Sequence, residues 1–176
     1  GAGAGGAASS FDLLETTVST GETYSVSFTN LNNYSAYKHL QIRMTHRGSS
    51  TSTSNSLAMI FNDSGSAYPY HSLQGNGTNV TSSGFADQPS MNFGFTVGST
   101  QTASVFAATV IDILDFGSSS KRKTVRVLHG RPAGTQQIAL QSGSWTSNDA
   151  LTKITLQLLA GNFVAGTRVS LYGIKG

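Results

Sequence analysis

Short segments in which apolar and polar residues alternate constrain the fold of this chain more than any other feature. In residues 22–30, large apolar side chains occupy every second position from Tyr24 to Phe28, with serine and threonine between them. Residues 39–47 repeat the pattern, with apolar side chains on one face and histidine, glutamine, arginine and threonine on the other. A period of two residues is typical of a strand with one buried face, so both segments are predicted strands.

Further segments have the same strand character, and turns rich in Gly, Asn, Ser and Pro separate them. They are residues 56–62, 91–97, 104–116, 123–130, 138–145, 153–159 and 168–176. We find no amphipathic helix, and only residues 147–151 suit a short helical turn. About ten strands without intervening helices predict an all-β fold, an antiparallel sandwich or barrel. Residues 105–114 are almost continuously apolar, which predicts a central strand covered on both faces.

The length of 176 residues favours one domain with its own core. Residues 1–10 contain no side chain large enough to build that core, so the domain is predicted to span residues 11–176. The first ten residues are expected to be a flexible arm or linker, either a loose terminus or an arm that docks on a neighbour. Charged residues make up only 11% of the chain, which suits a subunit packed among others, because a charged coat is costly to desolvate.

No combination of residues indicates an enzyme, a metal site or a cofactor. The chain has no cysteine. His39 and His46 are expected on opposite faces of one strand, so they cannot bind one metal ion together. Asp112 and Asp115 also point to opposite faces and cannot act as a pair on a glycosidic bond. We therefore expect no catalytic residue, no metal and no cofactor.

The charge pattern argues against nucleic acid and membranes as partners. A net charge of +3 is small for a dedicated DNA-binding protein. The densest basic run, residues 121–126, has no aromatic residue interleaved with it. No apolar run approaches the ~20 residues of a membrane span. Asp112 lies in the most apolar run, and we expect it to pair with Arg43 or Lys123.

Four aromatic residues in or beside polar loops are candidates for contact with a sugar ring: Tyr34, Tyr68, Tyr70 and Trp145. The polar loops are expected around residues 48–56 and 72–90, at the ends of the sandwich. A glycan site requires two or three of the rings at the same end. Each ring alone is also explained as a residue that packs where a strand ends, so both interpretations stay open.

Five segments carry a resemblance to proteins of known type. They are the Gly-rich opening with residues 11–31, then 37–47, 57–71, 110–124 and 143–176. In this order they resemble a broad group of tailed-bacteriophage virion proteins, and the match covers most of residues 5–176 except roughly 75–103. Residues 37–43, YKHLQIR, and 171–175, LYGIK, are the most specific parts. The resemblance implies a jelly-roll or lectin-like β-sandwich and no shared active site.

The resemblance also bears on the basic residues gathered in residues 37–47. A strand that recurs in a structural fold is expected to place its polar face against a neighbouring element or subunit. We therefore expect His39, Arg43 and Arg47 to be interface or loop-anchoring residues. The Gly-rich arm, with Gly1, Gly3, Gly5 and Gly6, is expected to reach along a neighbouring subunit, because glycine lets two backbones approach closely.

These expectations together predict a non-enzymatic virion protein on the exterior of a phage capsid, a decoration or cement subunit that binds other virion proteins. A homo-oligomer is expected, with a trimer as one option. The alternative is a receptor- or glycan-binding module at a tail fibre or tail tip, which would use the loops and their aromatic residues. Deletion of residues 1–10 is expected to weaken attachment to the particle without unfolding the domain.

Overall fold

A computed structural model describes residues 10–134 and 136–176 of the chain. These residues form strands and one short 3-10 helix, η1 (Leu31–Tyr34). The strands are β1 (Phe11–Val18), β2 (Ser25–Thr29), β3 (His39–His46), β4 (Ser54–Phe61), β5 (Tyr68–Gly75), β6 (Val80–Gln88), β7 (Met91–Val97), β8 (Ala107–Leu114), β9 (Lys123–Arg131), β10 (Gln137–Trp145), β11 (Lys153–Leu158) and β12 (Arg168–Ile174).

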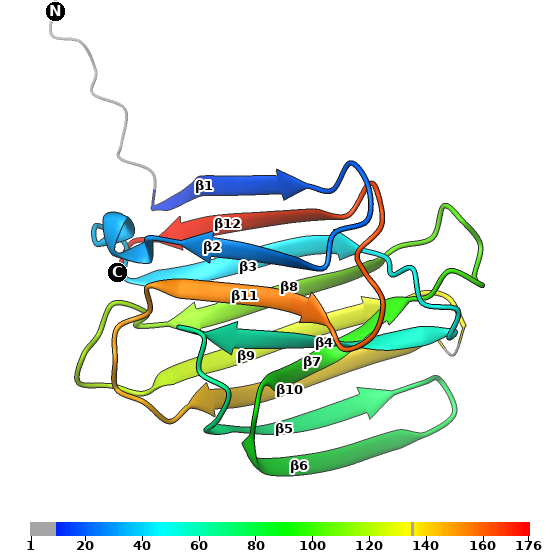
Figure 1. Cartoon of the computed structure of the whole chain (residues 1–176). Helices are drawn as coiled ribbons and strands as arrows, with labels where there is room; N and C mark the ends of the chain where they lie inside the picture. Colours follow the sequence, from blue (N-terminus) through cyan, green and yellow to red (C-terminus); the bar gives the residue numbers. More distant parts are fainter. Residues whose placement is uncertain (1–9, 135) are drawn as a thin grey trace, which may run out of the picture.

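The strands form two antiparallel sheets that lie face to face (Figure 1). The larger sheet has eight strands in the order β1-β12-β3-β8-β9-β10-β5-β6, and the smaller has four in the order β2-β11-β4-β7. When β5, β6, β9 and β10 are set aside, the chain passes to the other sheet after every strand except between β4 and β7, which pair with each other in the smaller sheet. The remaining orders, β1-β12-β3-β8 and β2-β11-β4-β7, are those of an eight-stranded jelly roll. The two extra pairs widen only the larger sheet.

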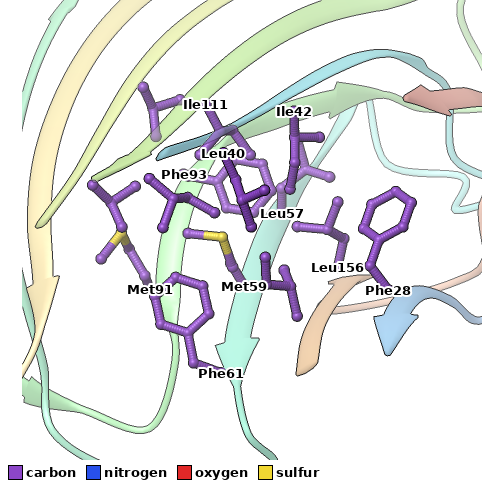
Figure 2. Close-up of a cluster of buried hydrophobic side chains, with 14 of the residues drawn as sticks. Phe28, Leu40, Ile42, Leu57, Met59, Phe61, Met91, Phe93, Ile111 and Leu156 are labelled. Atoms are coloured by element: carbon purple, nitrogen blue, oxygen red, sulfur yellow. The ribbon is translucent and has the colours of Figure 1, made fainter. Parts of the chain in front are cut away.

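The alternation of residue types explains how the core forms. In β3 the inward-facing Leu40 and Ile42 are fully buried, and in β4 Leu57 and Met59 are fully buried opposite them. Figure 2 shows these side chains meeting Phe28, Phe61 and Phe93 between the two sheets. Complete burial of one such side chain contributes about 1.5–3 kcal/mol. The core therefore holds the two sheets together along their shared width.

The prediction of an all-β antiparallel sandwich is confirmed, with twelve strands in place of about ten. Residues 147–151 contain no helical turn; instead, Ser147 Oγ contacts the backbone N–H of Asp149 at 3.0 Å. Strand β8 is central in its sheet, as expected for residues 105–114, but only one of its faces is covered by the second sheet. The predicted arm, with Gly1, Gly3, Gly5 and Gly6, lies outside the described residues apart from Ser10.

Candidate interaction surface

The outer face of the eight-stranded sheet carries an apolar row that crosses four neighbouring strands. The register pairs Val110 on β8 with Leu128 on β9, Leu128 with Leu140 on β10, and Leu140 with Leu73 on β5. Strands lie about 4.8 Å apart, so the row extends over about 14 Å. Ile138 lies on the same face of β10, two residues from Leu140. We call these five residues the apolar patch.

The residues of the apolar patch lie open to solvent in this chain. Leu73 is 50% exposed, Leu128 52%, Leu140 50% and Ile138 61%, while Val110 is half-buried. An exposed leucine by itself is ordinary, but a monomeric protein seldom leaves a contiguous group of them in water. The patch therefore marks this face as a candidate binding surface.

A groove of about 520 Å³ runs along one side of the patch. Its floor includes Ala108 and Gly130, which face each other in register and leave space because their side chains are small or absent. Leu128 and Ile138 line one side, and β3 and β12 line the other. The groove gives the surface a concave apolar part into which a partner's side chain fits.

Arg43 stands on the polar side of this groove. Its guanidinium lies 5.1 Å from the ring centre of Phe11 and 5.2 Å from that of Tyr172. Its Nε donates to Oε1 of Gln41 at 2.8 Å. The side chain is exposed and fixed by these contacts, so its charge is held at the border of the apolar surface. Arg43 is therefore an exposed cation at the border of the apolar patch, and its role as an interface residue stays a prediction.

A second polar group borders the patch beside Leu128. The Asp112 carboxylate accepts two hydrogen bonds, one from Nη2 of Arg126 at 2.9 Å and one from Nε2 of Gln41 at 2.7 Å. The prediction of Arg43 or Lys123 as the partner of Asp112 is therefore corrected. Lys123 faces the opposite side of the sheet, and Asp112 is only partly buried on the outer face. An apolar centre with a polar border is the usual anatomy of a protein interface.

Lys123 is fully buried and serves the fold. Its Nζ donates to the backbone carbonyls of Ser118 and Lys121 at 2.6 Å each and of Asn148 at 3.1 Å. Burial lowers the pKa of this ammonium group. The carbonyls replace the water that the group loses, which ties two loops to the start of β9.

The other two candidate interface residues occupy different environments. Arg47 is buried, and its guanidinium donates to four backbone carbonyls, those of residues 99, 101, 102 and 105. It therefore anchors a loop and is not available at the surface as an interface residue. His39 begins β3, and its Nδ1 accepts the backbone N–H of Asp115 at 3.0 Å. That ring stays partly exposed near the end of the sandwich.

Burial removes three of the four aromatic residues considered for glycan contact from the surface. Tyr68, Tyr70 and Trp145 are at most 4% exposed and belong to the hydrophobic core. Tyr68 begins β5 and Trp145 ends β10, so the strand-end packing interpretation fits both. Tyr34 is half-buried and donates to Oε1 of Glu15 at 2.7 Å, which raises its pKa to about 12. The four rings do not form a joint stacking surface.

A polar network joins the two sheets inside the sandwich. The rings of His46 and His129 are stacked with centres 5.9 Å apart, and both contact the hydroxyl of Thr109, at 2.8 and 2.9 Å. His46 also contacts Thr96 Oγ1 at 3.1 Å. Gly94 on β7 has φ +107°, and a Cβ there would lie 2.6 Å from the His129 ring. Only glycine lets the strand approach this ring so closely.

Sequence reasoning missed the apolar patch as a surface. A signal was present, because β9 and β10 carry apolar residues at both odd and even positions, for example Val127 followed by Leu128 and Ala139 followed by Leu140. Such strands are apolar on two faces, which predicts a covering layer on each. Among the residues that the structure describes, only one such layer is present, and the sequence did not indicate that the other face would be left open.

Comparison with known proteins identifies no relative of this chain. No protein-family model matches the chain, and no curated protein or solved structure matches it significantly. Within the described parts of the chain, no group of three or more His, Cys, Asp or Glu side chains is placed to hold a metal ion. Across the same residues, no helix is long and apolar enough to cross a membrane.

Proposed function

We propose that this chain is a non-enzymatic structural protein of a phage virion, a subunit on the capsid exterior that binds other virion proteins through the open face of its eight-stranded sheet. The apolar patch is the observation that carries the proposal. Its four leucine and isoleucine side chains are each at least half exposed and lie side by side on rigid strands. Covering such a face with a partner removes apolar area from water at about 25 cal/mol per Å².

Three further features support a packing role. Charged side chains are scarce along the whole chain, at 11%, so covering much of its surface desolvates few charges. The patch has a polar border in Arg43 and the Asp112–Arg126 ion pair, which can fix the orientation of a partner. The segments that resemble phage virion proteins include β3 and β12, which flank the groove. Many weak contacts repeated over a particle would add up through avidity.

The proposal is tested by adding the purified chain to phage particles that lack it and measuring the number of copies that bind. Leu128→Asp places a charge in the centre of the patch and is expected to reduce the number of bound copies at least tenfold. Leu159→Asp is the matched control, since Leu159 is 53% exposed but lies in the loop directly after β11, a strand of the smaller sheet. Circular dichroism verifies that both variants keep the wild-type fold. Equal attachment of both variants would contradict a role for the patch.

Immunogold labelling of intact particles locates the protein. Antibody raised against residues 11–176 is expected to label the surface of the head. Label confined to the tail tip or fibres would instead support the receptor-binding alternative. Particles without label at either place would overturn the proposal of a virion protein.

A further inference from the structure

Strand β6 ends the eight-stranded sheet on the side opposite to β1 and leaves one of its edges without a neighbour in the described chain (Figure 1). All its residues from Val80 to Asp87 are exposed, and Val80 is 74% exposed. Figure 1 shows β6 as the outermost strand, beyond β5. The inner face of β5 still reaches the core through Tyr68 and Tyr70, so only β6 is left uncovered by the second sheet. In a terminal strand, alternate residues direct N–H and C=O groups outward, where another strand can pair with them.

The other three sheet edges carry the protections that usually prevent such pairing. Strand β1 has a bulge between Leu13 and Glu15 and carries the carboxylates of Asp12 and Glu15. Strand β2 has only five residues. The open side of β7 is occupied within the molecule, because the Phe95 N–H donates to Nε2 of His129 at 3.3 Å. Short length, charge, irregular pairing and coverage are the recognised ways to block an edge.

The edge of β6 lacks charge and is regular over most of its length. The run from Val80 to Phe85 pairs with β5 residue by residue, and neither a charged residue nor a proline occurs in it. The irregularity comes only at the far end, where Asp87 has φ +49° and the register shifts. Six regular residues match the length of an ordinary strand. This edge is therefore open to a strand from outside.

We propose that β6 pairs antiparallel with β6 of a second copy of this chain, across a two-fold axis that passes through Ser82 or Ser83. Both registers keep the uncharged runs opposite each other. With the axis at Ser83, Asp87 faces the partner's Asn79, so no like charges meet. A two-fold contact of this kind uses the same surface on both subunits, the commonest arrangement in homo-oligomers. The inference does not depend on the proposed virion role.

Pairing of the two edges would also cover side chains that are now in water. Phe85 is 42% exposed and stacks on Tyr70 with ring centres 4.7 Å apart. With the axis at Ser83, Phe85 faces the partner's Thr81, and the hydrophobic Val80 faces the partner's Ala86. The two eight-stranded sheets would join into one sheet, which places both apolar patches on one continuous face.

A charge placed at the two-fold axis tests the pairing. In Ser83→Lys, the two lysines lie directly or diagonally opposite each other, about 5 to 8 Å apart in either register. The mass of the full chain is measured by light scattering from micromolar to millimolar concentration. The wild type is expected to dimerise, and Ser83→Lys is expected to raise the dimer dissociation constant at least tenfold. An equal mixture of Ser83→Lys and Ser83→Glu is expected to restore the dimer.

The matched control is Ser27→Lys on the edge strand β2. Ser27 Oγ contacts Thr155 Oγ1 on the adjacent strand at 3.0 Å, just as Ser83 Oγ contacts Ser72 Oγ at 2.9 Å. Both changes thus remove one similar contact, and only the change at Ser83 should affect association. A second readout needs no variant: hydrogen exchange of β6 amides in the wild type should slow as the concentration rises. A wild type that remains monomeric, or a dimer that Ser83→Lys leaves intact, would overturn the inference.

Discussion

At the scale of residues, the buried pair of His46 and His129 makes the stability of this protein depend on pH. Burial lowers the pKa of His129 to about 4 and holds the pKa of His46 well below its usual 6.5. Both rings are neutral in the folded chain, whereas the unfolded chain takes up protons below about pH 6.5. Each proton taken up only on unfolding favours the unfolded state by about 1.4 kcal/mol per pH unit.

The free energy of unfolding is therefore expected to fall as the pH decreases from about 6.5 toward 4. Urea denaturation at a series of pH values measures the slope. His129→Gln is expected to reduce the slope, because one titrating group is lost. His71→Gln is the control substitution, because His71 is exposed on the outer face of β5 and lies outside the buried pair. Constant stability between pH 7 and 4.5 would contradict this account of the pair.

Residue alternation predicted the inward face of β3 correctly but misplaced Arg47. The pattern assigns Arg47 to the same face as Arg43, yet β3 ends at His46 and the chain then turns toward the smaller sheet. A period of two holds only while the backbone stays extended in one sheet. For Tyr68 and Tyr70 the sequence left glycan contact and strand-end packing both open, and their burial on β5 agrees with packing.

At the scale of elements, Arg47 holds the loop between β7 and β8 to the end of β3. Its guanidinium is the shared donor to four backbone carbonyls in residues 99–105. Arg47→Met keeps a long apolar side chain but leaves these carbonyls without their donor. These contacts are only partly buried, so water can replace some of them, and we expect the loss of all four to reduce the free energy of unfolding by about 1–3 kcal/mol. Backbone amides of residues 99–105 are also expected to exchange hydrogen faster, which mass spectrometry measures peptide by peptide.

Arg168→Met is the control for this change. Arg168 is exposed on the outer face of β12, where it lines the groove. Its replacement is expected to alter stability by less than about 0.5 kcal/mol and to leave exchange in the loop unchanged. If Arg47→Met had the stability of the wild type, the hydrogen bonds from Arg47 to the four carbonyls would not account for the order of the loop.

Elements with a strong period of two were predictable, and the others were not. Nine of the strands coincide with predicted segments, β3 and β12 among those with alternation, and β8 with the continuous apolar run. The sequence did not reveal β1, β5 and β6 as strands. In β6, for example, the run from Val80 to Gln88 consists mostly of small or polar residues that are exposed on both faces. Backbone hydrogen bonds to β5 hold such a strand in place, and burial of its own side chains contributes little. The apolar run of β8 predicted that both of its faces would be covered. The sequence pattern does not distinguish a cover formed by a second sheet of the same chain from a cover formed by another molecule.

At the scale of the whole molecule, the last strand completes the fold. Strand β12 lies between β1 and β3 and pairs with both, so residues 11–18 reach the sheet only through residues 168–174. The sheet thus joins the two ends of the described chain. Contacts this distant in sequence form late, because closing a long loop costs entropy before any contact repays it.

A chain that stops before Arg168 is therefore expected not to fold. It would lose Val169 and Leu171 from the core and leave both β1 and β3 without a partner between them. We expect no cooperative unfolding transition by circular dichroism and strong binding of a hydrophobic dye. A chain that lacks only residues 175 and 176 is the control, because it keeps all of β12 and loses the 3.6 Å ion pair of Lys175 with Asp12. Cooperative unfolding of the shorter chain would mean that β3, β8 and their neighbours form a core without β12, and that the order of the sheet does not set the order of folding.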